Sequence, residues 1–519
     1  MPRRLLKPLR LGVALVFLAG LTAAFADFRG LVPAGLAHRL AAIQFTPALL
    51  ALGGGLALLL VFGAILGVTL AFGRVYCSTV CPLGLLQDAI ARLRAWLRPR
   101  RHLLPFAREN RWLRYGTFAA TIVTIAGGGS AVAFTLADPY SHFGRIVSGL
   151  FRPLLVVINN ALVPVAQHLG FQWLYRVAPS WPGPGLLLAA LLILVLLTGL
   201  VLWRERIYCN TLCPVGTGLG LLARHAAFRL TIAREACTKC TACLRVCKAQ
   251  CLDLRHGEID ASRCVVCFNC LAACPEQGIG LEFAWVRPPA ITEAEGWPAA
   301  SVSDPSRRAL LAGALWLAPA AVLPAARSSG RVPAARPPVT PPGAGGTERF
   351  LPRCTACQLC VSACPTQVLQ PARWEYSFTG LAKPRLDFER AFCNYDCHRC
   401  GEVCPTGAIA PLSLADKQLT SVGLARFAQE RCIVVLDGTD CAACSEHCPT
   451  KAVDTVPFRQ NLRLPRVTDE LCIGCGACEY ACPVRPRRAI TVEARAQHTR
   501  AKKAVEDRAP PPPRGGFAF

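Results

Sequence analysis

Cysteine is the residue type in this sequence with the most chemical potential: 29 of the 519 residues are cysteines, and most stand in short repeated groups. A disulfide scaffold also uses many cysteines, but such scaffolds are normally short secreted chains. Regular groups with a few residues between thiols favour ligation of metal ions or clusters instead. Two kinds of group occur, namely Cys-x3-Cys-Pro pairs after apolar segments and runs of the form Cys-x2-Cys-x2-Cys-x3-Cys.

Two runs of the second kind lie between residues 237 and 274. Their spacing is that of bacterial two-cluster ferredoxins, in which the fourth cysteine of each run ligates the other cluster. Three thiolates on a tight loop reach three corners of a [4Fe–4S] cube, so the fourth ligand must come from elsewhere. Zinc knuckles would not need three evenly spaced thiols and then a fourth. The spacing predicts one cluster on Cys237, Cys240, Cys243 and Cys274, and another on Cys264, Cys267, Cys270 and Cys247.

The same pattern returns twice, so the chain contains an internal repeat. In the second copy the gap between Cys393 and Cys397 is widened to three residues, and in the third copy eight residues separate Cys432 from Cys441. Only loops between ligands change, so four more clusters are predicted. Their ligands are expected to be Cys354, Cys357, Cys360 and Cys404; Cys393, Cys397, Cys400 and Cys364; Cys432, Cys441, Cys444 and Cys482; and Cys472, Cys475, Cys478 and Cys448. Cys251 is left over and is expected to be a small buried residue.

Four segments are apolar enough to cross a bilayer, whose core needs about 20 helical residues. They are residues 11–26, 45–73, 115–137 and 185–203, the first being somewhat short. Arginine and lysine gather before the first segment and after the second, which marks these sides as cytoplasmic. The formal net charge of +25 is therefore attributed to membrane orientation and lipid contact, since no nucleic-acid motif is present.

The Cys-x3-Cys-Pro pairs follow the second and fourth apolar segments, in GRVYCSTVCPLG and RERIYCNTLCPVG. Because both segments end on the same side, Cys77, Cys81, Cys209 and Cys213 are expected to meet at the cytoplasmic edge of the bilayer. They are predicted to form a seventh metal or iron–sulfur site. Two alternatives stay open: a redox-active thiol pair that closes a disulfide, and a Cys-Pro turn that only starts a helix.

Polar residues at the outer end of the third segment are candidates for binding a quinone. The stretch ADPYSHFGR supplies Asp138, Tyr140, His142 and Arg145, and a His or Asp there could accept the protons of a quinol. An interfacial anchor is the alternative reading. All nine histidines lie outside the four segments, which argues against a b-type haem inside the bundle.

The fold class expected is an α-helical membrane bundle joined to three α+β modules of the two-[4Fe–4S] type. Twin arginines precede a weakly apolar run in SRRALLAGALWLAPAAV, which resembles a Tat export signal; a plain fifth span is the alternative. The first module would then be cytoplasmic and the other two periplasmic, at a bacterial inner membrane. The predicted parts are a four-span domain (1–225), module one (226–290), the Tat-like segment (304–330), a Pro/Gly linker (331–349), module two (350–412), module three (425–492) and a disordered tail (493–519).

Together these motifs resemble known families. Cys-x3-Cys-Pro after two apolar segments, followed by a two-cluster ferredoxin, resembles the NapH/MauN-type membrane polyferredoxins over residues 1–285. Residues 304–495 resemble the NapG-type exported ferredoxins, so the chain looks like a fusion of the two. The resemblance implies a quinol dehydrogenase module that passes electrons from membrane quinol to a redox protein partner through six [4Fe–4S] clusters.

Some features depart from this pattern. Modules two and three depart from the usual NapG-type sequence in CTACQLCVSACPTQVL and DGTDCAACSEHCPTKAV. The identity of the redox partner as a nitrate reductase therefore does not follow from the resemblance. No flavin-attachment-like Ser/Thr-Gly-Ala-Thr sequence occurs, so no flavin is expected. The alternative function is an accessory polyferredoxin for metalloenzyme maturation or copper reduction, since cytochrome-oxidase assembly polyferredoxins share the membrane Cys-x3-Cys-Pro arrangement.

Overall fold

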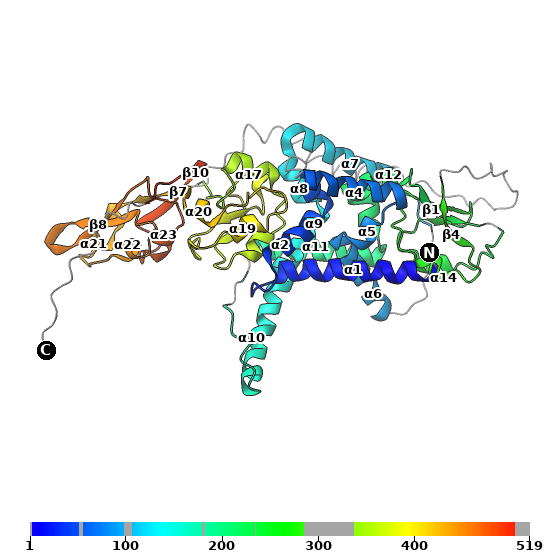
Figure 1. Ribbon diagram of the computed structural model, residues 1–519, viewed down its shortest axis with the longest axis horizontal. Coiled ribbons are helices and arrows are strands. Elements are labelled where there is room, and N and C mark those ends of the chain that lie inside the picture. Colours follow the sequence, from blue (N-terminus) through cyan, green and yellow to red (C-terminus); the bar gives the residue numbers. More distant parts are fainter. Residues whose placement is uncertain are drawn as a thin grey trace.

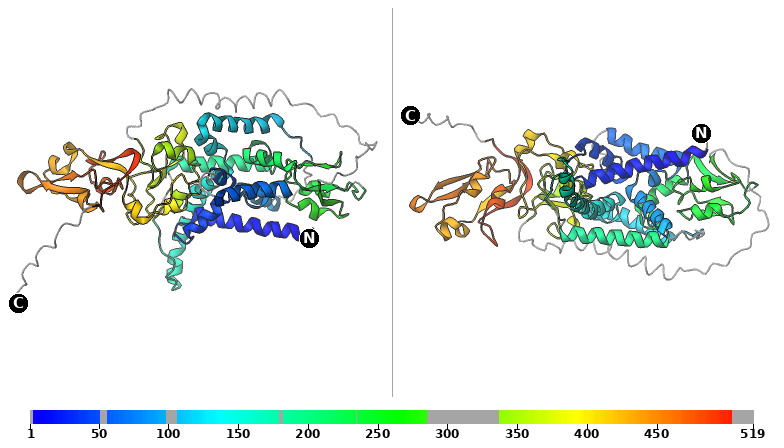
Figure 2. Two further views of the ribbon diagram at one scale, coloured as in Figure 1. Left: turned by 45° about the horizontal axis from the view of Figure 1, so that its top comes forward. Right: turned by 90° about the horizontal axis from the view of Figure 1, so that it is seen from below.

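A computed structural model describes residues 3–50, 56–97, 106–178, 181, 183–233, 235–284 and 337–503. A helical bundle forms the centre of the molecule, and small cysteine-rich modules lie at its two ends (Figures 1 and 2). We call residues 226–284 module 1, residues 337–419 module 2 and residues 420–503 module 3. Module 1 lies at one end of the bundle, and modules 2 and 3 follow one another from the opposite end. The predicted Tat-like segment 304–330 lies outside the described residues.

Long helices form the bundle because their sequences are apolar over many turns. The helices that coincide with the four predicted spans are α1 (Arg3–Ala26), α4 (Leu56–Phe72), α7 (Arg111–Thr124) with η2 (Ile125–Gly129) and α8 (Ser130–Ala137), and α11 (Pro184–Trp203). Asn110 starts α7 by accepting a hydrogen bond from the Leu113 amide at 3.1 Å, as an N-cap does. Pro184 opens α11 at a position where proline is favoured.

Three helices in the described part of the chain are long and apolar enough to cross a membrane, namely Leu5–Ala26, Pro139–His168 and Pro184–Trp203. The first and last match predicted spans, whereas α4 has only 17 residues within the described range. The middle one was predicted to be a connection, and it consists of α9 (Pro139–Ile146), η3 (Val147–Phe151) and α10 (Arg152–His168). This candidate contains His142 and His168, so the expectation that histidines lie outside the spans holds only for the four segments that the sequence predicts.

Helix α10 leaves the bundle and points across the direction of α1 (Figure 1). It exposes apolar side chains such as Leu154, Leu162 and Val165. A helix in this direction would lie along a membrane surface if α1 crosses it, which agrees with an interfacial rather than a spanning role.

Both Cys-x3-Cys-Pro loops turn back into the bundle after the long helices that precede them. The short elements they form are α5 (Tyr76–Thr79) and α6 (Pro82–Leu97) in the first loop, and η4 (Tyr208–Leu212) and α12 (Pro214–Ala223) in the second. Helix α5 packs against α1, and α6 packs against α9 and α11. Helices α2 (Ala34–Ala42) and α3 (Phe45–Leu50) lie between α1 and α4 in the chain. The Tyr76 hydroxyl accepts a hydrogen bond of 3.0 Å from the backbone amide of Phe45, the first residue of α3.

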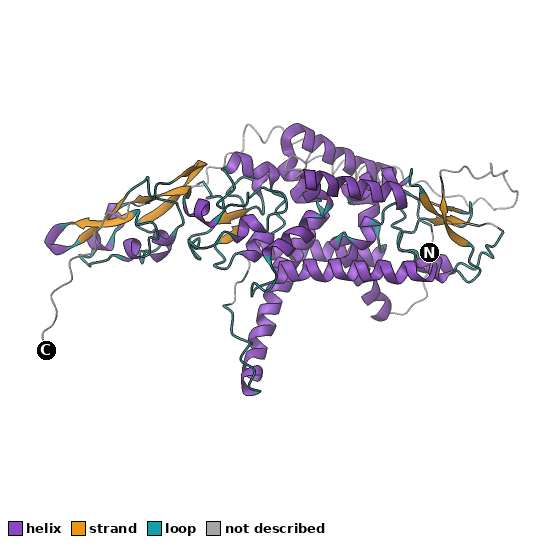
Figure 3. Ribbon diagram, in the orientation of Figure 1, coloured by secondary structure: helices purple, strands orange, loops and turns teal. Residues whose placement is uncertain are grey.

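Module 1 is a small α+β unit with two short antiparallel strand pairs, shown in orange in Figure 3. In β1–β4, Phe228 pairs with Phe283 and Ile232 with Ile279; in β2–β3, Leu252 pairs with Ile259. The elements are β1 (Phe228–Ile232), α13 (Ala242–Val246), β2 (Leu252–Asp253), β3 (Glu258–Ile259), α14 (Asn269–Ala273) and β4 (Ile279–Phe283).

Module 2 repeats this plan with one strand pair, β5–β6, in which Leu369 pairs with Leu386. Its elements are α17 (Thr347–Arg353), α18 (Leu359–Ala363), β5 (Leu369–Pro371), η5 (Phe378–Gly380), β6 (Pro384–Leu386), α19 (Arg399–Glu402) and α20 (Leu414–Gln418). Part of the predicted Pro/Gly linker belongs to this module, because Val339 is buried and accepts the Leu386 amide at 2.9 Å.

Module 3 contains the longest strand pair, β7–β10, with Ile490 opposite Phe427. Its elements are β7 (Thr420–Phe427), η6 (Gln429–Arg431), α21 (Ile433–Leu436), α22 (Ala443–Glu446), β8 (Val453–Pro457), η7 (Arg459–Asn461), β9 (Arg463–Val467), α23 (Ala477–Ala481) and β10 (Ile490–Arg500). Disorder was predicted from residue 493, but β10 continues to Arg500 because β7 supplies its hydrogen-bonding partners. Residues 504–519 lie outside the described part.

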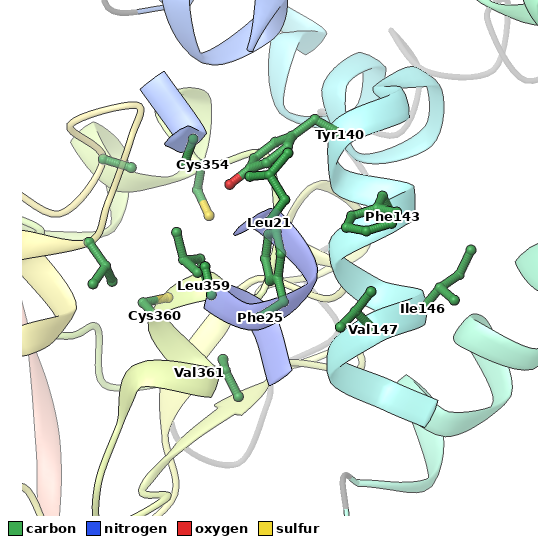
Figure 4. Packing of buried hydrophobic residues seen from close by; sticks show 14 of the residues in the cluster. Leu21, Phe25, Tyr140, Phe143, Ile146, Val147, Cys354, Leu359, Cys360 and Val361 are labelled. Atoms are coloured by element: carbon green, nitrogen blue, oxygen red, sulfur yellow. The ribbon is translucent and has the colours of Figure 1, made fainter. Parts of the chain in front are cut away.

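The largest buried cluster is continuous from the bundle into module 2. Phe25 of α1 packs against Tyr140 and Phe143 of α9, with ring centroids 5.6 and 6.2 Å apart. Figure 4 shows these rings beside Leu359 and Cys360 of module 2. Since they share one buried cluster, module 2 is docked on the bundle by apolar packing.

Candidate metal centres

Four of the six cysteine runs share one unusual backbone conformation. In each Cys-x2-Cys loop, the residue before the second cysteine and the residue after it have positive φ. These pairs are Lys239 and Thr241, Val266 and Phe268, Ala356 and Gln358, and Gly474 and Gly476. Alternating right- and left-handed residues turn successive N–H groups into one concavity, a nest that binds anions and is found at iron–sulfur sites. The loops therefore fit an anionic iron–sulfur cluster.

In module 1 the thiols gather in the quartets that the spacing predicts. One cavity is lined by Cys237, Cys240, Cys243 and Cys274. A second cavity is lined by Cys247, Cys264, Cys267 and Cys270. Each quartet combines three cysteines of one run with the fourth cysteine of the other, as a crossed two-cluster arrangement requires.

Module 2 repeats the crossed arrangement despite its changed spacing. Cys364 lines one cavity with the three thiols of the other run, Cys393, Cys397 and Cys400. On the other side, burial raises the pKa of Cys360, and the thiols of Cys357, Cys354 and Cys404 raise it further. The widened Cys393–Cys397 gap therefore leaves the grouping of thiols intact.

Module 3 groups its thiols in the same way. Burial raises the pKa of Cys444 to about 12, with contributions from the nearby thiols of Cys441, Cys432 and Cys482. Burial likewise raises the pKa of Cys478, whose thiol neighbours include Cys475, Cys472 and Cys448. The first four of the eight residues between Cys432 and Cys441 form α21, which explains how the ligand loop lengthens while the thiols still meet.

No three His, Cys, Asp or Glu side chains in the described ranges are placed to hold a single metal ion.

The Cys-x3-Cys-Pro loops meet inside the bundle and are related by an internal symmetry. Cys77, Cys81, Cys209 and Cys213 are all buried. Arg74 donates to the Cys209 carbonyl oxygen at 2.9 Å, and Arg206 donates to the Cys77 carbonyl oxygen at 3.0 Å. Each arginine therefore holds the cysteine loop of the other half. Burial raises the pKa of Cys81, with further contributions from the thiols of Cys209 and Cys77, so the two pairs are close neighbours.

Two glycines make this close approach possible. A Cβ atom on Gly84 would lie 2.5 Å from the Cys77 carbonyl oxygen, and one on Gly216 would lie 2.3 Å from the Cys209 carbonyl oxygen. Each would also lie 2.8 Å from a guanidinium nitrogen, of Arg206 and Arg74 respectively. The symmetric pair thus leaves room for backbone and arginine beside the thiols.

The surroundings of the four thiols are rich in buried positive charge. Arg74 and Arg206 are almost fully buried. Asp88 contacts Arg206 at 2.8 Å, Lys248 at 3.2 Å and Arg10 at 3.6 Å. The sequence analysis did not predict these buried charges, although the repeated Arg-x-x-Cys order in GRVYC and RERIYC indicates Arg74 and Arg206.

The predicted quinone residues are brought together in α9 and just before it, where Arg145 contacts module 2. Asp138 caps α9 by accepting the amides of Tyr140 and Ser141. Arg145 donates to the carbonyl oxygens of Ala356 and Thr355, in the first cysteine loop of module 2, at 3.2 and 3.4 Å. A role of these residues in quinone binding stays a prediction.

His142 and Tyr140, both in α9, have different neighbours. His142 Nε2 lies 3.0 Å from the Leu136 carbonyl oxygen. Figure 4 shows the Tyr140 hydroxyl directed toward Cys354. Tyr140 therefore lies between the bundle and a cysteine quartet, whereas His142 contacts the end of α8.

The leftover Cys251 is buried, as predicted, but it is not isolated. Its Sγ lies 3.8 Å from that of Cys247. It therefore packs beside a quartet to which the spacing did not assign it.

Comparison with protein families finds iron–sulfur domains in both halves of the chain. A 4Fe-4S binding domain matches residues 55–103 and 184–232, which contain the two Cys-x3-Cys-Pro loops. Two 4Fe-4S dicluster domains match residues 353–408 and 438–486, in modules 2 and 3. No solved structure matches the chain significantly.

Individual relatives match different parts of the chain. The ferredoxin-type protein NapF of Escherichia coli strain K12 is 30% identical over 157 residues, which cover 30% of this chain and 84% of NapF. The ferredoxin-type protein NapH of Haemophilus influenzae is 29% identical over 253 residues, covering 46% of this chain and 71% of NapH. The regulatory protein NosR of Pseudomonas aeruginosa is 29% identical over 207 residues, 39% of this chain and 24% of NosR.

Proposed function

The chain belongs to the NapH-like membrane polyferredoxins, and we propose that it relays electrons between the quinol pool and a redox protein through six [4Fe–4S] clusters. That it is an iron–sulfur electron-transfer protein of the membrane follows from its relatives, its domains and its apolar helices. The number of clusters and the use of quinol are parts of the proposal. That the chain is a fusion with a NapG-like half is also part of the proposal, because the relatives described above are NapF, NapH and NosR.

The observation that supports six clusters is the crossed grouping of thiols. Three quartets line one cavity each, and the other three consist of mutually close thiols in modules 2 and 3. Twenty-four thiolates would thus hold the clusters. When bound, such clusters accept and donate single electrons without proton transfer.

Two modules also make direct contact at their cysteine loops. The Cys393 amide of module 2 donates to the Cys475 carbonyl oxygen of module 3 at 2.9 Å. These cysteines belong to different predicted clusters. An electron could therefore leave module 2 for module 3 across a hydrogen-bonded backbone contact.

Quinol would enter from the membrane bundle at the start of α9. In this proposal, Asp138 and His142 are the groups near the bilayer boundary that could accept its protons. Their neighbour Arg145 contacts the first cysteine loop of module 2, so electrons would have a short way to the clusters. We propose the bacterial inner membrane as the location, with module 1 cytoplasmic and modules 2 and 3 periplasmic.

The test is reduction of the anaerobically purified, lipid-reconstituted full chain by menaquinol. We expect bleaching of the iron–sulfur absorbance and the appearance of reduced-cluster EPR signals. Dithionite serves as the positive control for clusters that can be reduced at all. Clusters that dithionite reduces but menaquinol leaves oxidised would contradict the quinol part alone, whereas an absence of reducible clusters would contradict the whole proposal.

A further inference from the structure

The four thiols of the Cys-x3-Cys-Pro loops lie between module 1 and module 2, in the interior of the bundle. Cys77, Cys81 and Cys213 belong to the same continuous buried cluster as Cys267 of module 1 and Cys354 of module 2. The two end modules are separated by the length of the bundle (Figures 1 and 2). A membrane core of about 30 Å would isolate their clusters from one another unless a redox site lies between them.

Resting on the function proposed above, we propose that Cys77, Cys81, Cys209 and Cys213 bind a seventh iron–sulfur cluster, through which electrons cross the membrane between module 1 and module 2. The relay would then be vectorial, because each electron would move charge from one face of the bilayer to the other.

The charge around the four thiols favours an anionic cluster over neutral thiols or disulfides. Two buried arginines lie beside the thiols: Arg74 is 3.9 Å from the Cys77 sulfur, and Arg206 is 3.9 Å from the Cys209 sulfur. Arg206 is paired with the carboxylate of Asp88. Apart from the Cys77 sulfur, the hydrogen-bond acceptors described for Arg74 are the carbonyl oxygens of Ser262 and Cys209 and the amide oxygen of Asn210, which carry no charge. An uncompensated buried charge is costly. Four thiolates around an oxidised iron–sulfur core carry a net charge of −2, whereas disulfides carry none.

On the side of module 1, the four-thiol loops touch the loops of the nearest quartet. Asn210, next to Cys209, donates to the Ala249 carbonyl oxygen at 3.2 Å. Arg74 donates to the Ser262 carbonyl oxygen at 3.1 Å. Ala249 and Ser262 each stand two residues from a predicted ligand, Cys247 and Cys264 respectively. The nearest cluster of module 1 therefore adjoins the four-thiol site through protein that is packed and hydrogen-bonded.

On the side of module 2, aromatic rings fill the interval. Tyr208, next to Cys209, lies with its ring centroid 6.4 Å from that of His142. Tyr140 belongs to the same short helix, and its ring lies against Phe25 and toward Cys354. Arg145, one turn further on, binds the cysteine loop itself. A row of neighbouring side chains thus connects the four-thiol site with the first quartet of module 2.

The electron balance of the crossing is simple. In the crossing, one electron from a one-electron reductant on the module 1 side, which is dithionite in the test below, would reduce the cluster of the nearest quartet. It would pass to the four-thiol cluster and then to module 2, and each site would return to its oxidised state. A one-electron acceptor beside module 3 is reduced. No proton is transferred and no covalent bond forms or breaks. A cation must cross the membrane in the same direction as the electron to keep the charge on each side neutral.

The test uses the full chain in sealed vesicles that contain ferricyanide, with dithionite outside and valinomycin with potassium to relieve charge build-up. We expect internal ferricyanide to bleach in wild-type vesicles, in whichever direction the protein is inserted. The Cys77→Ser/Cys209→Ser variant is expected to bleach no faster than protein-free vesicles, and to lose one cluster's worth of iron. Ser78→Ala is the matched control in the same loop, since Ser78 is not a proposed ligand and its hydroxyl donates to the Val75 carbonyl oxygen of that loop.

Each outcome bears on the inference. Dithionite reduction in detergent first checks that the clusters of the three modules are present in every variant, and Cys81→Ser/Cys213→Ser provides a second variant if the first does not fold. Reducible wild-type protein that leaves the internal ferricyanide untouched would overturn the crossing, as would a double variant that conducts like wild type. Wild-type protein with no reducible cluster in detergent would instead overturn the proposed function.

Discussion

The guanidinium of Arg206 lies 2.8 Å from the carboxylate of Asp88, and both side chains are buried. Burial raises the pKa of Asp88, but Arg206, Lys248 and Arg10 more than offset this, so the pKa is lowered overall. The carboxylate is therefore ionised at neutral pH. Its stabilising effect would be lost only in acid, as pH falls through the lowered pKa.

Asp88→Asn should destabilise the bundle, because three buried cations would lose their common anion. Breaking a buried ion pair in this way costs about 3–5 kcal/mol. Thermal or denaturant unfolding in detergent would measure it. Glu470→Gln is the control, since Glu470 pairs with Lys502 at the surface and such a pair contributes at most about 1 kcal/mol. Equal losses of unfolding free energy for the two substitutions would contradict a stabilising role for the buried ion pairs of Asp88.

Gly84→Ala should disrupt the four-thiol site while leaving the modules folded. The added methyl would lie 2.5 Å from the Cys77 carbonyl oxygen and 2.8 Å from Arg206, so backbone and guanidinium must move. We expect loss of the four-thiol cluster in iron analysis and EPR. Gly116→Ala in α7 meets no neighbouring atom within 4 Å and should be neutral, or stabilising by up to about 1 kcal/mol. An unchanged spectrum for Gly84→Ala would count against the symmetric arrangement.

His498 predicts a pH dependence at the junction of modules 2 and 3. It lies 2.8 Å from Thr340 Oγ1, and burial followed by the charge of Arg349 lowers its pKa to about 4. The unfolded chain binds a proton near pH 6.5, which the folded chain does not bind until about pH 4. The junction should therefore lose stability as pH falls from 7 toward 4. Hydrogen exchange at the Gly346–Gln497 bridge should follow this fall, and His498→Gln should flatten it.

Cys404→Ser should remove the cluster of Cys354, Cys357 and Cys360, although Cys404 lies in the other run. Iron should fall by about four atoms per chain, as for one [4Fe–4S] cluster. Cys251→Ser should leave the iron content unchanged, since this thiol belongs to no predicted quartet. If Cys404→Ser instead removed the cluster of Cys393, Cys397 and Cys400, the crossed assignment would be wrong.

Much of the site was predictable because ligand chemistry restricts cysteine spacing. The quartets of module 1 follow from three thiols per loop and one exchanged, and the structure groups those thiols accordingly. The positive φ at Lys239 and Thr241 belongs to the same local rule. Such ligand loops can be predicted from the sequence because their conformation depends on residues that are close together in the chain.

Tertiary relationships were harder to predict. Nothing near Asp138 in sequence indicates that α9 binds the Ala356 loop of module 2. The sequence predicts a disordered tail after Val492, yet β7 supplies hydrogen-bonding partners for β10 as far as Arg500. The sequence predicts a connection over residues 138–184, whereas the structure contains an apolar helix of 30 residues there, Pro139–His168. In each case a partner distant in sequence decides the structure.

The most direct test of this account is the iron, acid-labile sulfide and EPR spin count of the anaerobically purified full chain. Six [4Fe–4S] clusters require brown protein with roughly two dozen iron atoms per chain in the ferredoxin modules alone, and reduced-cluster signals after dithionite. Colourless protein with zinc or no metal in these sites would contradict it.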